Sequence, residues 1–221
     1  MFHVRRDFAR PSAEAIAAIA PYSPATIHEA QGKLGALDSR IKPIKPGLKI
    51  CGPALTAKCH IGDNLMIFEA LNRAKPGDVL VVSAGNNPEQ GGFGDVLAAA
   101  CRGKGIVGLV IDAGVRDGRG LRESGFPVFS FGLCIKGTSK DTLGTVNKPV
   151  MVGNELIEPG DIIVGDDDGV VVVRQDPFTL AKACAAREAD EARLIEMHLS
   201  GKNEFDVHYE TMRRKGCVWV D

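Results

Sequence analysis

The middle of the chain alternates between apolar, strand-like runs and helix-like segments, and this alternation limits the fold more than any other feature. The apolar runs are rich in β-branched residues, as is typical of buried strands. In chain order the strand and helix segments are 79–83, 95–102, 106–112, 116–124 and 127–131. Strands joined by helical crossovers pair in parallel within one sheet. The sequence therefore predicts an α/β fold.

Segments on both sides of this region add further strands. Residues 49–60 have an extended pattern. Residues 149–158 and 160–174 are typical of successive β segments, with turns at Pro159-Gly160 and Asp168-Gly169. Strands joined by tight turns pair antiparallel, so we expect a mixed sheet.

Further helices are expected outside the central alternation. Asp63 is a residue type that caps helix N-termini, and Gly and Pro punctuate the other segments. The helical segments are 12–20, 24–32, 63–74 and 177–199. The tail at 200–221 is mostly polar and is expected to be arm-like. Because no linker or low-complexity segment interrupts the chain, we expect a single domain over 1–221.

One short pattern occurs twice. KPGDVLVV at 75–82 is similar to EPGDIIVG at 158–165, and both fit a tight Pro-Gly turn that enters a strand. Shared turn chemistry explains the similarity, and an internal duplication is the alternative.

The bulk composition excludes several classes of protein. The net charge is -1, which argues against a nucleic-acid or membrane-surface partner held by charge. No apolar run approaches the roughly 20 residues that span a bilayer. None of the six cysteines forms a C-x-x-C pair, as expected for reduced thiols in a cytosolic protein. We therefore expect a cytoplasmic protein without a nucleic-acid or membrane partner.

A glycine-rich loop precedes the helix predicted at 95–102. Its sequence is Gly91-Gly92-Phe93-Gly94-Asp95. The first turn of a helix leaves backbone N–H groups unpaired and carries partial positive charge, so a small carboxylate binds well there. Taken alone, a flexible loop with Asp95 as the helix cap explains the segment equally well.

A second group of polar residues follows the strand predicted at 106–112. Arg116 can bind a carboxylate through two parallel hydrogen bonds, and Asp117 offers a hard oxygen ligand for Mg²⁺ or Mn²⁺. Ligands of α/β sheets gather at the carboxyl ends of strands. An ordinary surface Arg-Asp pair at a helix start is the alternative.

The glycine-rich loop with Asp95 and the Arg116-Asp117 pair indicate a binding site more strongly together than either does alone. The pattern is D-x20-R-D, and its interval of one helix, one turn and one strand returns the chain to the same edge of the sheet. A carboxylate-binding loop, an Arg and a metal-binding Asp would then share one pocket. These parts suit enolate chemistry on a 2-oxo acid.

The chain resembles the 4-hydroxy-4-methyl-2-oxoglutarate/4-carboxy-4-hydroxy-2-oxoadipate aldolases, in the superfamily of the regulator of ribonuclease activity A. The resemblance extends from about Ala25 to Arg193. Besides D-x20-R-D, the matching motifs are TIHEAQGKLG (26–35), GDNLM (62–66), FPVFSFG (126–132), TLGTVNKPV (142–150) and PGDIIVGDDDGVVVV (159–173).

The resemblance implies a three-layer fold of the swivelling β/β/α type with a mixed sheet and a long C-terminal helix. It implies a homotrimer or homohexamer, in which residues 177–221 contact a neighbouring subunit and the site lies between subunits. The implied reaction is class II cleavage of a 4-hydroxy-2-oxo acid to pyruvate and a second 2-oxo acid, with oxaloacetate decarboxylation as a side activity.

The resemblance also implies roles for single residues. Asp117 would bind Mg²⁺ or Mn²⁺, and Arg116 would bind the pyruvate carboxylate together with backbone N–H groups of Gly94, Asp95, Val96 and Leu97. Asp95 would hold a metal-bound water that acts as the base.

A carboxylate from the neighbouring subunit's C-terminal helix is expected to complete the site. Glu191 is preferred to Glu188, which lies three residues away on the same helix face. A solvated charged helix is the alternative for each. His28 and Asn64 fall in matching motifs and receive no role.

Four alternatives remain at this stage. The chain could be chiefly an oxaloacetate decarboxylase, which would use the same site and the same enolate. The chain could be a non-catalytic protein that binds and regulates a ribonuclease. Lys58 could act as a Schiff base in a class I aldolase, which would leave D-x20-R-D without a function. Asp166-Asp167-Asp168-Gly169 could be a second metal site, although a hairpin turn explains it.

Overall fold

The computed structural model describes residues 3–202 and 205–220. Contacts divide the chain into two compact units, one ending at Cys184 and the other beginning at Ala185. This boundary falls inside helix α6 (Pro177–Leu199), the long C-terminal helix that the sequence predicted. The expectation of a single domain over 1–221 stays a prediction.

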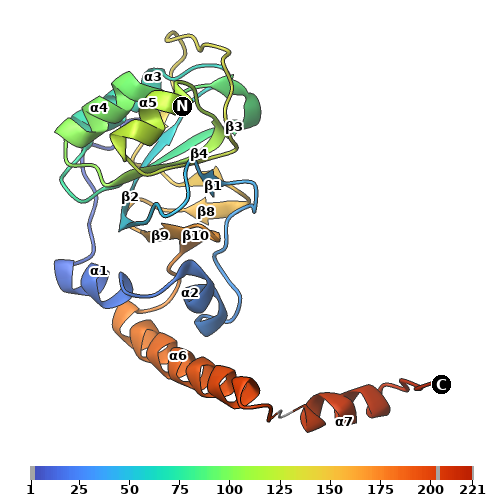
Figure 1. Cartoon of the computed structure of the whole chain (residues 1–221). Coiled ribbons are helices and arrows are strands. Elements are labelled where there is room, and N and C mark those ends of the chain that lie inside the picture. Colours follow the sequence, from blue (N-terminus) through green and yellow to red (C-terminus); the bar gives the residue numbers. More distant parts are fainter. Residues whose placement is uncertain (1–2, 203–204, 221) are drawn as a thin grey trace. The chain divides into compact units, whose positions relative to one another are not determined.

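The first unit is built on a mixed sheet with a parallel centre (Figure 1). Its parallel strands are β2 (Ile50–Lys58), β3 (Val79–Gly91), β4 (Gly108–Gly114) and β5 (Val128–Ser130). The predicted order of strands and crossover helices is confirmed.

Antiparallel strands extend this centre on both sides. The sheet order is β1-β5-β4-β3-β2-β9-β10, and β6 also pairs with β2. The added strands are β1 (Lys42–Pro43), β6 (Thr145–Val146), β9 (Ile162–Asp166) and β10 (Gly169–Val172). A separate hairpin consists of β7 (Val150–Val152) and β8 (Glu155–Ile157).

Helices cover the sheet in two groups (Figure 1). The crossover helices α3 (Leu65–Arg73), α4 (Asp95–Gly103) and α5 (Gly118–Ser124) lie together beside the parallel strands. The helices α1 (Ala13–Ile19) and α2 (Pro24–Ala30) lie beside β9 and β10, where Leu180 and Cys184 of α6 also pack. The predicted β/β/α layering is confirmed.

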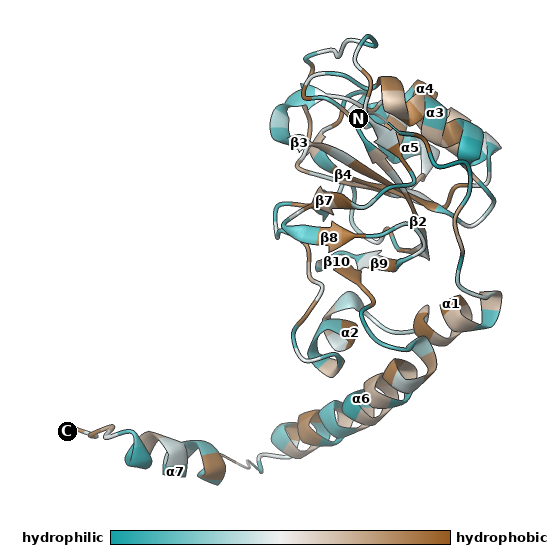
Figure 2. Ribbon diagram, turned by 180° about the vertical axis from the view of Figure 1, so that it is seen from behind, coloured by the Kyte–Doolittle hydropathy of each residue, from teal (hydrophilic) through white to brown (hydrophobic). Residues whose placement is uncertain are grey.

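The strands of the parallel centre are buried on both faces, which explains their continuous apolar sequence. In β3, Leu80 and Val82 join the core beneath α3 and α4, whereas Val79 and Val81 join the core shared with the β7–β8 hairpin. Successive side chains of a strand point to opposite faces. Figure 2 shows the apolar colouring concentrated in strands such as β4 and β7.

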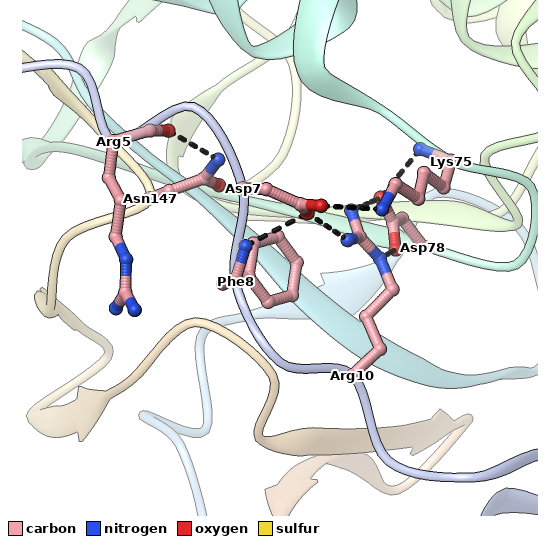
Figure 3. A network of polar contacts seen from close by, with 7 residues as sticks. All are labelled: Arg5, Asp7, Phe8, Arg10, Lys75, Asp78 and Asn147. Atoms are coloured by element: carbon pink, nitrogen blue, oxygen red, sulfur yellow. Dashed lines mark hydrogen bonds and ion pairs between the residues drawn. The ribbon is translucent and has the colours of Figure 1, made fainter.

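The N-terminal segment is fixed to the first unit by a buried ion pair (Figure 3). Arg10 donates to both oxygens of Asp78, each at 2.7 Å, and the Asp78 carboxylate is fully buried. This hydrogen bond is the main reason why the pKa of Arg10 is raised. Arg5 and Asn147 join the segment to the strand region around β6, through Asn147 Nδ2 and the Arg5 carbonyl at 2.9 Å.

The two Pro-Gly-Asp sequences form the same turn. Gly77 and Gly160 have φ angles of 93° and 96°, in the region that favours glycine. Asp78 Oδ2 accepts from Lys75 N (2.8 Å), and Asp161 Oδ2 accepts from Glu158 N (2.9 Å). These matching bonds favour shared turn chemistry as the origin of the repeat.

Two predicted boundaries were wrong. β3 continues through the predicted loop to Gly91 with shifts in register, because buried Asp112 accepts from Ala84 N (2.5 Å) and Asn86 N (3.1 Å). Asn64, not Asp63, is the N-cap of α3. The tail contains the helix α7 (Asp206–Arg214), none of whose residues is buried. Among the described residues, no helix is long and apolar enough to cross a membrane.

Candidate active site

The ends of β3 and β4 bring the two predicted groups of residues together. Arg116 N donates to Phe93 O (2.8 Å), and Gly92 N donates to Gly114 O (3.2 Å). These bonds place the glycine-rich loop directly beside the Arg116-Asp117 turn. The prediction that D-x20-R-D converges at one sheet edge is confirmed.

A pocket of about 170 Å³ opens at this convergence. Five of the predicted residues line it, and all of its lining residues belong to the first unit. The lining residues are Asn64, Phe68, Gly91, Gly92, Phe93, Gly94, Val96, Leu97, Arg116, Asp117, Thr138 and Lys140.

Gly94 is required where the loop passes the metal-ligand candidate. A β-carbon at Gly94 would lie 2.2 Å from Asp117 Oδ2 and 3.2 Å from Arg116 Cγ. The φ angle of Gly94 is -146°, so the need is for space and not for an unusual backbone. The Asp117 carboxylate therefore lies against the bare backbone at the start of α4.

Asp117 itself has a left-handed backbone, with φ 57° and ψ 39°. It is the N-cap residue of α5, yet its side chain makes no capping hydrogen bond. Its Oδ2 lies 3.5 Å from Arg116 Nε, and both side chains are partly exposed, at 39% and 51%. The carboxylate is thus directed to the pocket instead of to its own helix.

Asp95 lies beside the pocket but is not among the lining residues. Its Oδ1 accepts from Val96 N at 2.7 Å, which uses one of the N–H groups expected to bind substrate. Its Oδ2 faces Gly120 of α5, where a β-carbon would lie 3.1 Å away. The carboxylate is exposed to solvent.

Glu191 and Glu188 belong to the second unit, on the later turns of α6. Glu191 Oε1 pairs with Arg187 Nη2 at 2.9 Å, one helical turn away. Their predicted contribution to a site on a neighbouring subunit stays a prediction.

The far wall of the pocket comes from residues that received no role from the sequence. Asn64 and Phe68 lie one helical turn apart at the start of α3, and Thr138 and Lys140 lie in the segment after β5. The GDNLM motif was a signal for Asn64, whereas no pattern singled out the other three. His28 lines another pocket beside α2, and Lys58 lines a third at the end of β2.

Asn64 provides a test of whether the pocket suits a divalent cation. Its Nδ2 donates to Gly92 O at 2.8 Å, and its Oδ1 is buried without a hydrogen-bond partner among the described residues. Carboxylate and amide oxygens are ligands that Mg²⁺ and Mn²⁺ prefer, and Mg²⁺ is often held by one or two carboxylates with water and substrate. Asp117 and Asn64 both line the pocket and carry oxygen atoms of this kind. In the described part of the chain, no group of three His, Cys, Asp or Glu residues could hold a metal, the Asp166–Asp168 turn included.

The family model described as RraA-like: Aldolase/RraA matches residues 24–172. The chain belongs to this family. A relative from Halalkalibacterium halodurans is 38% identical over 169 residues, which cover 76% of this chain and 80% of the relative, and it is provisionally named a 4-hydroxy-4-methyl-2-oxoglutarate aldolase.

Solved structures of the family share the fold. An uncharacterized protein from Pseudomonas syringae matches with a TM-score of 0.78 and 25% identity, over 89% of this chain and 93% of that one. Streptomyces coelicolor RraAS2, described as an unusual member of the RNase ES inhibitor RraA family, matches with a TM-score of 0.72 and 31% identity. That match covers 87% of this chain and 98% of RraAS2.

Proposed function

We propose that this chain is a metal-dependent pyruvate aldolase. Its substrates would be 4-carboxy-4-hydroxy-2-oxoadipate, 4-hydroxy-4-methyl-2-oxoglutarate or both, with oxaloacetate decarboxylation as a side activity. The observation that carries the proposal is the pocket in which Arg116 and Asp117 face the N-terminal turn of α4. The provisional name of the Halalkalibacterium relative supports the same reaction class.

The pocket offers two means of binding the pyruvoyl end of the substrate. The Arg116 guanidinium can donate two parallel hydrogen bonds to the carboxylate. The first turn of α4 also faces the pocket through Val96 and Leu97, and Val96 N–H would exchange its bond to Asp95 for one to the substrate. These contacts would fix the 2-oxo group beside Asp117.

Asp117, with Asn64 Oδ1, would hold Mg²⁺ or Mn²⁺. A divalent cation supplies stabilisation of the negative charge that develops on the 2-oxo oxygen as the C3–C4 bond breaks. Asp95 has Oδ2 free of the Val96 N–H bond and would accept the C4 hydroxyl proton through water. The hydroxyl carbon becomes a ketone, and C3 gains a proton to give pyruvate. Glu191 of a neighbouring copy would assist Asp95.

Pyruvate release, coupled to lactate dehydrogenase, tests the proposal. We expect activity on at least one of the two hydroxy acids or oxaloacetate, lost when EDTA is present and restored by Mg²⁺ or Mn²⁺. Arg116→Ala and Asp117→Asn should each lose about 10²-fold or more in kcat/KM. Arg119→Ala is the matched control, because Arg119 is 90% exposed on α5 and pairs with the exposed Glu123 one helical turn away. Absence of pyruvate with all three substrates would disprove the proposal.

The similarity to RraAS2 favours one alternative, a non-catalytic regulator of a ribonuclease. Such a protein would inhibit an RNase ES-type enzyme, and it would do so equally with and without EDTA. A ribonuclease assay run beside the pyruvate assay separates the two functions. In the regulator, Asp117→Asn would leave inhibition unchanged.

A further inference from the structure

The segment after β5 forms one wall of the pocket without belonging to a helix or a strand. Residues 133–137 are tied to the β4 side, where Cys134 N donates to Val115 O and Gly91 N donates to Lys136 O, each at 2.8 Å. Residues 138–142 follow directly and include Thr138 and Lys140, which line the pocket. Their position must therefore be set by something other than regular structure.

The Asp63 side chain accepts several hydrogen bonds from this second half. Its Oδ2 accepts from Ser139 Oγ (2.8 Å), Asp141 N (2.7 Å) and Thr142 N (3.0 Å). Its Oδ1 accepts from Leu65 N at the start of α3 (2.7 Å). The side chain has only 3% exposure, so water does not substitute readily for these donors.

The turn formed by Gly62, Asp63 and Asn64 also contacts the glycine-rich loop on the pocket. Ser139 N donates to Gly62 O (2.9 Å), and Asn64 N donates to Ser139 O (3.1 Å). Asn64 Nδ2 in turn donates to Gly92 O in the glycine-rich loop (2.8 Å). One three-residue turn thus connects the segment with Thr138 and Lys140 to the loop that leads into α4.

We propose that Asp63 is a positioning residue that holds residues 138–142 against the active-site pocket before substrate binds. Asp63 is not among the lining residues and touches no reacting atom; it acts through Thr138 and Lys140. The kinetic part of this proposal rests on the aldolase function proposed above, and the structural part does not.

A carboxylate is needed because it accepts on both oxygens. In Asp63→Asn one oxygen becomes an NH₂ donor. It would then face either Leu65 N–H or the donors of Ser139, Asp141 and Thr142. A freed segment must be ordered at each binding event, which weakens substrate affinity more than it slows the chemical step.

Two measurements on the full-length protein test the proposal. In hydrogen–deuterium exchange, Asp63→Asn should exchange faster at the amides of residues 138–142, with β3 and β4 unchanged. In the pyruvate assay, its KM should rise about 10-fold or more, with kcat changed less than about 3-fold. Asp176→Asn is the matched control, because the Asp176 carboxylate also accepts a backbone N–H at a helix start (Thr179 N, 2.9 Å). The control should change neither measurement.

Ser139→Ala provides a milder variant in case Asp63→Asn does not fold. It removes one of the four donors and should shift KM and local exchange in the same direction, by about 2- to 5-fold. Unchanged exchange at 138–142 would overturn the proposal. The proposal would also be overturned if exchange became faster equally over the whole sheet, or if the variant lost kcat without a change in KM. If the wild-type protein releases no pyruvate, the aldolase proposal fails while the exchange result still decides the role of Asp63.

Discussion

Asp117 combines an unfavourable backbone with a side chain that makes no capping hydrogen bond to its own helix. A left-handed conformation in a residue other than glycine costs of order 1–3 kcal/mol, although Asp tolerates it better than most residues. The neighbouring bond from Arg116 N to Phe93 O fixes the turn in which this conformation occurs. The cost is consistent with a carboxylate that must point at a ligand instead of capping α5.

The contact between Gly94 and Asp117 leads to a substitution test. Gly94→Ala places a methyl group 2.2 Å from Asp117 Oδ2, so the carboxylate must move. We expect a loss of about 10²-fold or more in kcat/KM and weaker Mn²⁺ binding by titration calorimetry. Gly103→Ala, at the end of the same helix with open space around it, is the control. Normal activity in Gly94→Ala would show that the position of Asp117 is not critical.

The Arg10–Asp78 pair predicts a large effect on stability. Removal of the guanidinium leaves the fully buried Asp78 carboxylate without its charged partner. We expect Arg10→Ala to lower the free energy of unfolding by about 3–5 kcal/mol, measured in urea. Arg119→Ala removes an exposed pair and should change it by less than about 1 kcal/mol. If Arg10→Ala changed the free energy of unfolding by no more than Arg119→Ala does, the buried pair would not be important for stability.

At the scale of elements, the sequence predicted the strands and turns that depend on nearby residues alone. The strands around Val81, Val110 and Phe129 were predictable because their continuous apolar sequence is typical of buried strands. The turns at Gly77 and Gly160 were predictable because glycine readily adopts the positive φ angle that these turns need. The extension of β3 beyond Ser83 was missed, because it depends on buried Asp112, a residue from another strand. Long-range bonds of this kind leave no local signal.

The stabilisation that Asp63 gives to the α3 start and to residues 138–142 depends on pH. Burial alone would raise the pKa of Asp63, but hydrogen bonds from Asp141, Leu65, Ser139 and Thr142 lower it to about 2. The stabilisation is therefore complete above the ordinary pKa and is lost as the pH falls through about 2. The difference in unfolding free energy between wild type and Asp63→Asn should shrink by about 1 kcal/mol from pH 5 to pH 3, in urea titrations. A difference that grows over this range would contradict the direction of the shift.

At the scale of the whole molecule, the candidate site was only partly predictable. D-x20-R-D identified the near wall because it links two strand ends through one crossover. The rest of the lining was missed, because Phe68 lies on α3 and Thr138 and Lys140 lie in an irregular segment whose contact with Asp63 leaves no local signal. The proposed role of Glu191 depends on a neighbouring copy of the chain, so no local pattern around Glu191 specifies it.

Subunit mixing tests whether two copies build one site. Asp117→Asn and Glu191→Gln chains should each be inactive alone. In a 1:1 mixed oligomer, about a quarter of the sites would combine one intact Asp117 with one intact Glu191 from different chains. We therefore expect activity to return to about that fraction of wild type in the pyruvate assay. No recovery would mean that Asp117 and Glu191 of different chains do not form one site. Activity in Glu191→Gln alone would instead remove Glu191 from the site, and the same experiment with Glu188→Gln would then test the other carboxylate.

The order of the strands also affects how the chain can fold during its synthesis. Residues 50–53 of β2 pair with 162–165 of β9, and Arg5 N donates to Val146 O. Segments near the N-terminus therefore pair only after the later segments have been synthesised. While the ribosome makes the intervening residues, β2 has its β9 edge open, and an open edge invites association with other chains. The N-terminal segment emerges first but cannot complete its contacts until about two thirds of the chain exists. Folding around the central sheet is thus a late event in translation, and nascent chains of this protein should depend on chaperones more than a fold with local pairing would.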